Sequence, residues 1–367
     1  MKLSTAALGA TAAGAIGLGA LTLPASAGSA PALPPVSPED LVASVLTAKA
    51  PAFGGNVEVD NALGLPALPG MAGPAAALAA PVTTFRAWSD GQGRGRLALP
   101  SSDGEQVLVE DGSTLWRYDS AARTATALSH DAAKAPEHAP VADPATAARE
   151  LVGAVRQSST VGVDGTAMVA GRPVYELVLT PKPTERTLLR EVRVAVDSAA
   201  RVPLQLTVLA NGSLDPALQI GFTQLQVGPQ DPALFRFIPP DGVTVKKPDP
   251  ARAPTGHAPG DHAPGQAPPG GPDAAGAMIR TVGDGWDTVA LGRLPAVAPA
   301  APRTEHGGPS TPADPLALVK KVGRPVSGPW GNGWVVQTKV GTVLVAADGR
   351  IAGGAVPQQV LEAALTR

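Results

Sequence analysis

The sequence predicts an α+β protein whose main part is one curved antiparallel sheet with an apolar face, followed by a small C-terminal α+β module. Short segments that alternate apolar and polar residues follow one another between residues 56 and 208, a period typical of strands with one buried and one solvent-facing side. Turn-forming residues separate them by short distances, which favours antiparallel neighbours. Two helical patterns interrupt the strands, and a Pro/Gly-rich run separates residues 278–367 from them.

The first residues resemble an export signal. Met1 and Lys2 precede an apolar run from Ala6 to Leu23, and small residues that signal peptidase accepts end at Ala27. We expect residues 1–27 to be cleaved, giving an exported, soluble protein of the cell envelope or medium. An uncleaved anchor is the alternative, because the run is nearly long enough to span a bilayer. The chain has no Cys, which excludes disulfides and the acylated Cys of a lipoprotein.

Composition argues against several functions. The formal net charge is −2, and the 29 Lys and Arg residues are scattered, so no basic stripe indicates a nucleic-acid partner. No activated nucleophile, phosphate loop or pair of carboxylates in an apolar setting stands out, and we expect neither an enzyme nor a cofactor. The five His residues lie in linkers or loops. A metal site at His257 and His262 is the alternative, which the lack of carboxylates at ligand spacing disfavours.

Two helices are predicted from their start signals. After a leader at residues 28–36, Ser37 is a typical N-cap and Pro38 suits the first helical position, with acidic residues next. We expect this helix to run to about Lys49. Asp143 and Pro144 form a similar start, and the second helix should end near Gln157.

Strands and linkers fill the remainder. The alternating apolar positions that predict strands include Val57 and Val59, Leu97 and Leu99, Val107 and Val109, Leu177 and Leu179, Val192 to Val196, and Val202 to Val208. Residues 61–80 lack periodicity, and we interpret them as a flap between strands. Residues 248–277 form a low-complexity Pro/Gly/His linker that cannot bury a hydrophobic core. The C-terminal module contains a Pro/Ala insert at about 295–313, a hairpin near residues 333–350 and a helix at 357–365.

Three stretches together carry a family resemblance. The first is the strand, turn and strand at residues 108–118, continued at 125–128. The second contains the next three strands, at residues 175–182, 190–196 and 202–208. The third is the closing segment, FRFIPPDGVTV at residues 235–245. With these stretches, residues 37–247 resemble the LolA-type lipoprotein carriers, a family with LolB- and RseB-like members. The resemblance is to an actinobacterial-type member with a C-terminal extension.

The resemblance implies an eleven-stranded half-open barrel with helices as a lid over a hydrophobic cavity on the concave face. It also implies a monomer that takes the acyl chains of a lipid or lipoprotein. The candidate cavity residues are Val107, Val109, Trp116, Tyr118, Leu177, Leu179, Val194, Leu204, Leu206 and Phe222. Ordinary sheet core is the alternative for the aromatic ones. Family members latch the lid with an arginine on an early strand; Arg94 is the candidate here, with Arg86 and Arg96 as alternatives.

Three functions follow from these observations. The first is a secreted or periplasm-side carrier or sensor of lipids or lipoproteins. The second is an RseB-like envelope-stress regulator, whose module at residues 278–367 binds a membrane-bound anti-sigma factor or another membrane protein. The third is a structural module of the cell surface. Trp330 and Trp334 are either a partner-binding knob of that module or its small core.

Overall fold

The computed structural model describes residues 31–64, 80–101, 103–129, 143–246, 279–294 and 315–366. The predicted signal peptide, most of the predicted flap and linker, the Pro/Ala insert and all five His residues lie outside the described residues. None of the described helices is both long enough and apolar enough to cross a membrane.

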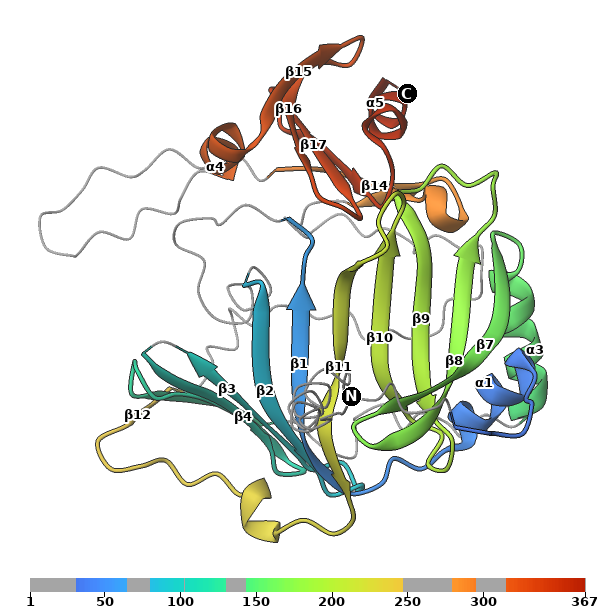
Figure 1. The fold of residues 1–367 in the computed structure, drawn as a ribbon. Helices are drawn as coiled ribbons and strands as arrows, with labels where there is room; N and C mark the ends of the chain where they lie inside the picture. The colour runs from blue at the N-terminus through green and yellow to red at the C-terminus, as the bar shows by residue number, and fades with distance from the viewer. Residues whose placement is uncertain are drawn as a thin grey trace, which may run out of the picture.

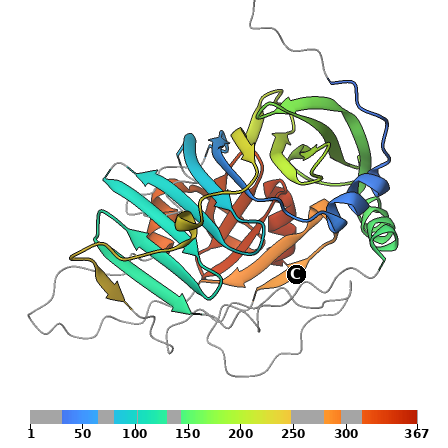
Figure 2. The same ribbon diagram turned by 90° about the horizontal axis from the view of Figure 1, so that it is seen from below.

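Twelve strands form one large sheet in the order β12-β6-β5-β4-β3-β2-β1-β11-β10-β9-β8-β7. The bounds are Phe53–Asn61 (β1), Val82–Ser89 (β2), Gly95–Ser101 (β3), Gly104–Glu110 (β4), Thr114–Asp119 (β5), Thr124–Ser129 (β6), Ser159–Val169 (β7), Arg172–Pro181 (β8), Leu189–Asp197 (β9), Pro203–Ala210 (β10), Pro216–Val227 (β11) and Thr244–Lys246 (β12). The sheet is curved but not closed, with β12 and β7 at its edges (Figures 1 and 2). The predicted fold class is confirmed.

All neighbours in the large sheet are antiparallel except β12, which pairs parallel to β6. This short strand lies at the end of the predicted closing segment, which begins at the last residue of the 3-10 turn η2 (Pro232–Phe235). The β7–β8 hairpin shows why the turns form where the sequence predicts them. Ala170 and Gly171 both have positive φ, 48° and 75°, as the tight reversal between twisted strands requires.

Both predicted helices are present. Helix α1 (Pro38–Thr47) begins where the Ser37 side chain accepts a hydrogen bond from the Asp40 amide, at 3.0 Å. Helix α3 (Pro144–Val155) begins in the same way at Asp143. The two helices lie side by side next to β7 (Figures 1 and 2). Leu41 of α1 is fully buried in a cluster with Tyr175 and Val196 of the large sheet.

A second sheet contains six strands in the order β13-β14-β18-β17-β16-β15. The bounds are Arg280–Val282 (β13), Val289–Arg293 (β14), Arg324–Gly328 (β15), Gly331–Gln337 (β16), Thr342–Ala346 (β17) and Arg350–Gly354 (β18), with helices α4 (Pro315–Val322) and α5 (Gln358–Thr366). Leu344, Leu361 and Trp330 lie in one buried cluster between this sheet and α5. Trp330 is therefore core, whereas Trp334 is partly exposed and lies 5.1 Å from the ammonium of Lys320.

The C-terminal module contacts the large sheet at the loop between β8 and β9 (Figure 1). Leu188 donates a backbone hydrogen bond to the Ala355 carbonyl at 2.8 Å. The indole Nε1 of Trp286 donates to Ser159 Oγ at 2.7 Å, and Arg186 pairs with Asp287, also at 2.7 Å. Polar contacts thus join the two sheets.

Candidate functional site

One face of the large sheet is apolar across many strands. Residues paired directly across antiparallel strands lie on the same face. One such row contains Leu177, Val194, Leu206, Ile220 and Val59. Helix α1 packs on this face through Leu41, and we call it the helix-side face.

The helix-side face continues past β1 to the far strands. Val57 pairs with Phe85 of β2 and with Phe222 of β11, and further along Leu97 pairs with Leu108. Val57 is buried, whereas Phe85, Phe222 and Leu108 are partly covered and Leu97 is 37% exposed. An extended apolar surface is therefore left open on this side of the sheet.

A cavity of about 280 Å³ lies where β1 begins and β11 ends, beside the β9–β10 turn. Its apolar lining includes Phe53, Val202, Leu204, Phe222, Leu225 and Val227, and the segment that joins α1 to β1 closes part of it. The rings of Phe53 and Phe222 meet edge to face with 5.5 Å between centroids. A cavity with this lining favours aliphatic or aromatic ligand groups.

A buried ion pair forms part of the cavity wall. The Asp197 side chain is 1% exposed and accepts hydrogen bonds from the Arg172 guanidinium and from the Ala199 and Ala200 amides. Burial raises the pKa of Asp197, but the hydrogen bonds from Arg172 and these amides outweigh it and hold the pKa below its ordinary value. The carboxylate therefore stays charged and fixes the β9–β10 turn beside the cavity.

The structure divides the predicted cavity residues between two faces. Leu177, Leu179, Val194, Leu206 and Phe222 lie on the helix-side face. Leu204 lines the small cavity beside Phe222, next to a register irregularity between Pro203 and Gln205. The contact of these residues with a lipid stays a prediction.

The other four predicted residues lie on the opposite face. Val107 pairs with Tyr118, and Val109 pairs with Trp116. Both pairs point away from the face that carries Leu108, which lies between Val107 and Val109 on β4. The closing segment covers them, because the Phe237 ring lies 5.2 Å from the Trp116 ring and 5.5 Å from that of Tyr118. One cavity on one face cannot contain all ten predicted residues.

Arg94 contacts the closing segment and its own turn. Its Nε lies 2.6 Å from Asp90 Oδ2, and its guanidinium is 5.6 Å from the centre of the Phe235 ring. The arginine that joins the two helices is Arg156, which pairs with Glu39 of α1. The latch role of Arg94 stays a prediction, and the Arg156–Glu39 pair was missed by the sequence analysis.

No protein-family model and no curated protein matches the sequence. A chain from the Pseudomonas aeruginosa MucA/MucB complex is 17% identical, with 89% of this chain and 94% of that chain covered and a TM-score of 0.38. An uncharacterized conserved protein from Thermus thermophilus is 11% identical, with 57% and 96% covered and a TM-score of 0.33.

A LolA superfamily protein from Nitrosomonas europaea is also similar. It is 13% identical, with 55% of this chain and 99% of that chain covered and a TM-score of 0.22. The half-open sheet with helices on one face that the sequence resemblance predicts is the fold described above.

Proposed function

We propose that this protein is exported and binds the acyl chains of a lipid or lipoprotein on the helix-side face, as a carrier or a sensor. The observation that supports the proposal is the apolar helix-side face, which is buried at Val57 and Val59 and left partly exposed at Leu177, Leu206 and Leu97. Large apolar surfaces of this kind mark ligand or partner sites. The lining offers no catalytic group, and the proposal involves no reaction.

The energetics favour a flexible apolar chain as the ligand. Each buried methylene contributes about 0.8 kcal/mol, so a long acyl chain gains on the order of 10 kcal/mol before the cost of ordering it. The cavity near Phe222 is closed on one side by chain, which gives the end of such an acyl chain a place to insert. Branched and polar ligands gain less from the same surface.

The two helices are suited to act as a lid. Leu41 of α1 packs on the sheet, and the Arg156–Glu39 pair, whose Arg side chain is 45% exposed, joins the two helices. Exposed ion pairs contribute only about 0–1 kcal/mol. The main cost of moving the helices is therefore the exposure of buried apolar residues such as Ala148 and Val152 of α3.

Acyl binding is tested by a pair of substitutions on neighbouring residues of β10. Leu206→Gln makes the helix-side face polar, while Gln205→Leu is the reverse exchange on the opposite face. We expect the first to weaken binding of a fluorescent C16 fatty acid at least tenfold and the second to leave it within twofold. Native mass spectrometry of the protein from its own host should show a bound lipid. Equal affinities for the probe in both variants reject the helix-side face.

A regulatory role is the second candidate, and the junction between the sheets favours it. The β8–β9 loop that contacts the C-terminal module through Leu188 and Arg186 joins the two strands that carry Leu177 and Val194. A ligand bound on the helix-side face therefore contacts β8 and β9, the two strands whose connecting loop touches the module. In this proposal the module binds a membrane protein, such as an anti-sigma factor, and deletion of residues 279–366 should abolish its capture without preventing probe binding. Unchanged capture rejects this candidate.

A further inference from the structure

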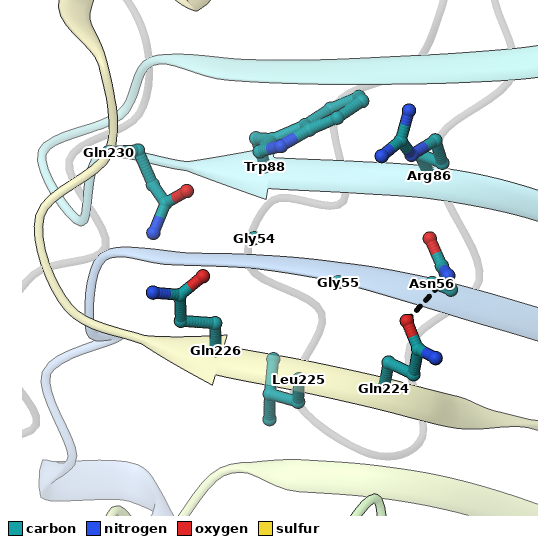
Figure 3. Close-up of a pocket in the computed structure, with 9 residues that line it drawn as sticks. All are labelled: Gly54, Gly55, Asn56, Arg86, Trp88, Gln224, Leu225, Gln226 and Gln230. Atoms are coloured by element: carbon teal, nitrogen blue, oxygen red, sulfur yellow. Dashed lines mark hydrogen bonds between the residues drawn. The ribbon is translucent and has the colours of Figure 1, made fainter.

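A second cavity, of about 310 Å³, lies on the face of the large sheet opposite to the helix-side face (Figure 3). It spans β1, β2 and the end of β11. Its polar lining consists of Asn56, Arg86, Trp88, Gln224, Gln226 and Gln230. The sheet separates it from the surface proposed for acyl chains, so a ligand here is independent of that proposal.

The absence of a side chain at Gly54 creates the floor of this cavity. A Cβ at this position would lie 2.6 Å from Gln230 Oε1 and 2.8 Å from Trp88 Cδ1, closer than real contacts allow. The glycine therefore leaves room for an amide and an indole close to the strand, and Figure 3 shows the Gln230 and Trp88 side chains near Gly54. Any larger residue would displace both groups and fill the space between them.

The amide side chains present free donors and acceptors to the cavity. Asn56 Nδ2 donates to Gln224 Oε1 at 3.0 Å, which leaves Asn56 Oδ1 and Gln224 Nε2 for a ligand. Gln230 Nε2 donates to the Gly228 carbonyl at 2.9 Å, which leaves its oxygen. Within the described part of the chain, the amide of Gln226 and the indole N–H of Trp88 have no hydrogen-bond partner. The pattern thus mixes donors with acceptors.

The charge of the lining limits the ligand further. Arg86 is its one charged side chain, and its guanidinium lies 5.3 Å from the centre of the Trp88 ring, a cation–π contact that orients it. A single cation leaves most of the negative charge of a phosphate-rich ligand unpaired, which disfavours such a ligand. The absence of carboxylates from this lining equally disfavours a metal ion.

We propose that this cavity binds a saccharide of one or two rings. Each sugar hydroxyl both donates and accepts hydrogen bonds, as the side-chain amides of this lining do. The indole supplies an apolar edge for the C–H groups of the ring, and Arg86 is placed to meet a hydroxyl or the carboxylate of an acidic sugar. The volume lies at the small end of ligand cavities.

The test follows the indole N–H signal of Trp88 by NMR in the full chain labelled with ¹⁵N. The chain has five Trp residues, and Trp88→Phe identifies the relevant signal. Maltose and chitobiose serve as neutral probes and digalacturonate as the acidic one. We expect at least one of them to shift the Trp88 signal in a saturable way at millimolar concentration.

Two variants decide whether the cavity is responsible. Gln224→Ala combined with Gln226→Ala should weaken binding at least tenfold. Gln219→Ala, on the same strand and the same face but outside the lining, should leave it within twofold. If the double variant does not fold by circular dichroism, Arg86→Gln replaces it, with the same expectation for digalacturonate. A Trp88 signal that none of the three sugars moves, or binding that survives the double variant, overturns the proposal.

Discussion

The two sheets of this protein differ in what covers their apolar faces. In the C-terminal sheet, helix α5 completes the core, and Leu344 and Leu361 are both 0% exposed. In the large sheet, α1 buries Tyr175 and Val196 at one end, while Leu97 and Leu128 remain 37% and 48% exposed. The small sheet obtains its full hydrophobic stabilisation within the chain. The large one keeps apolar area that a second molecule can bury.

The strongest test of this difference compares the same truncation in both sheets. Leu344→Ala removes fully buried methyl groups and should cost about 3 kcal/mol of unfolding free energy. Leu206→Ala lies on the half-open face, and we expect a loss of about 1 kcal/mol or less. Urea unfolding, followed separately for each sheet, measures both. Equal losses would show that the large sheet is as fully packed as the small one.

A second test concerns the wall of the apolar cavity. Arg172→Ala leaves the buried Asp197 carboxylate with only its backbone partners, and it should cost about 2 kcal/mol, in the range of charged hydrogen bonds. Arg186→Ala removes an ion pair whose Arg side chain is 65% exposed, and it should change stability by less than about 1 kcal/mol. Thermal unfolding measures both, and similar losses would contradict the assigned burial.

The same ion pair predicts a pH dependence. Because the pKa of Asp197 is lower in the folded protein than in the unfolded chain, its contribution is fully present above the unfolded value of about 4. It is lost as the pH falls through the lower, folded value. Asp197→Asn should therefore flatten the decline of stability below about pH 4. If urea unfolding shows the same decline of stability below about pH 4 in Asp197→Asn, Asp197 is excluded as the cause of that decline.

The smallest expected effect concerns the lid. Ser37→Ala removes the N-cap hydrogen bond of α1 and should cost about 1 kcal/mol, confined to the helix. Faster hydrogen exchange in residues 38–47, with the C-terminal sheet unchanged, is the expected signature. Ser44→Ala on the same helix is the control, because its hydroxyl bonds to the Leu41 carbonyl inside the helix and caps nothing. Equal exchange in both variants would argue against the cap.

Local chemistry made the elements predictable. Ser37 with Pro38, and Asp143 with Pro144, begin the helices as expected, and Gly171 takes the positive φ that its turn requires. The assignment of faces was not predictable for β4. Val107, Leu108 and Val109 are apolar in succession, so alternation alone does not say which side faces the closing segment and which faces the open surface.

Features made by distant residues were also beyond the sequence pattern. The polar cavity joins Asn56 of β1 to Gln224 of β11, and no local period connects two such residues. The same holds for Trp286, whose indole bonds to Ser159 across the junction between the sheets. The LolA-type resemblance implied the half-open sheet with its helices, and it carried no information about the C-terminal module.

The position of β1 has a consequence for the order of folding. This first strand lies in the middle of the sheet, between β2 and β11, and Val57 pairs with Phe222. The last strand, β12, in turn pairs with β6 at the edge. Loop-closure entropy therefore opposes assembly until residues near 246 have joined the chain, and such non-local pairing makes folding slow. Within β2 to β6 and within β7 to β11, the strands pair with their sequence neighbours, so β1 is the strand that has to join these two halves into one sheet.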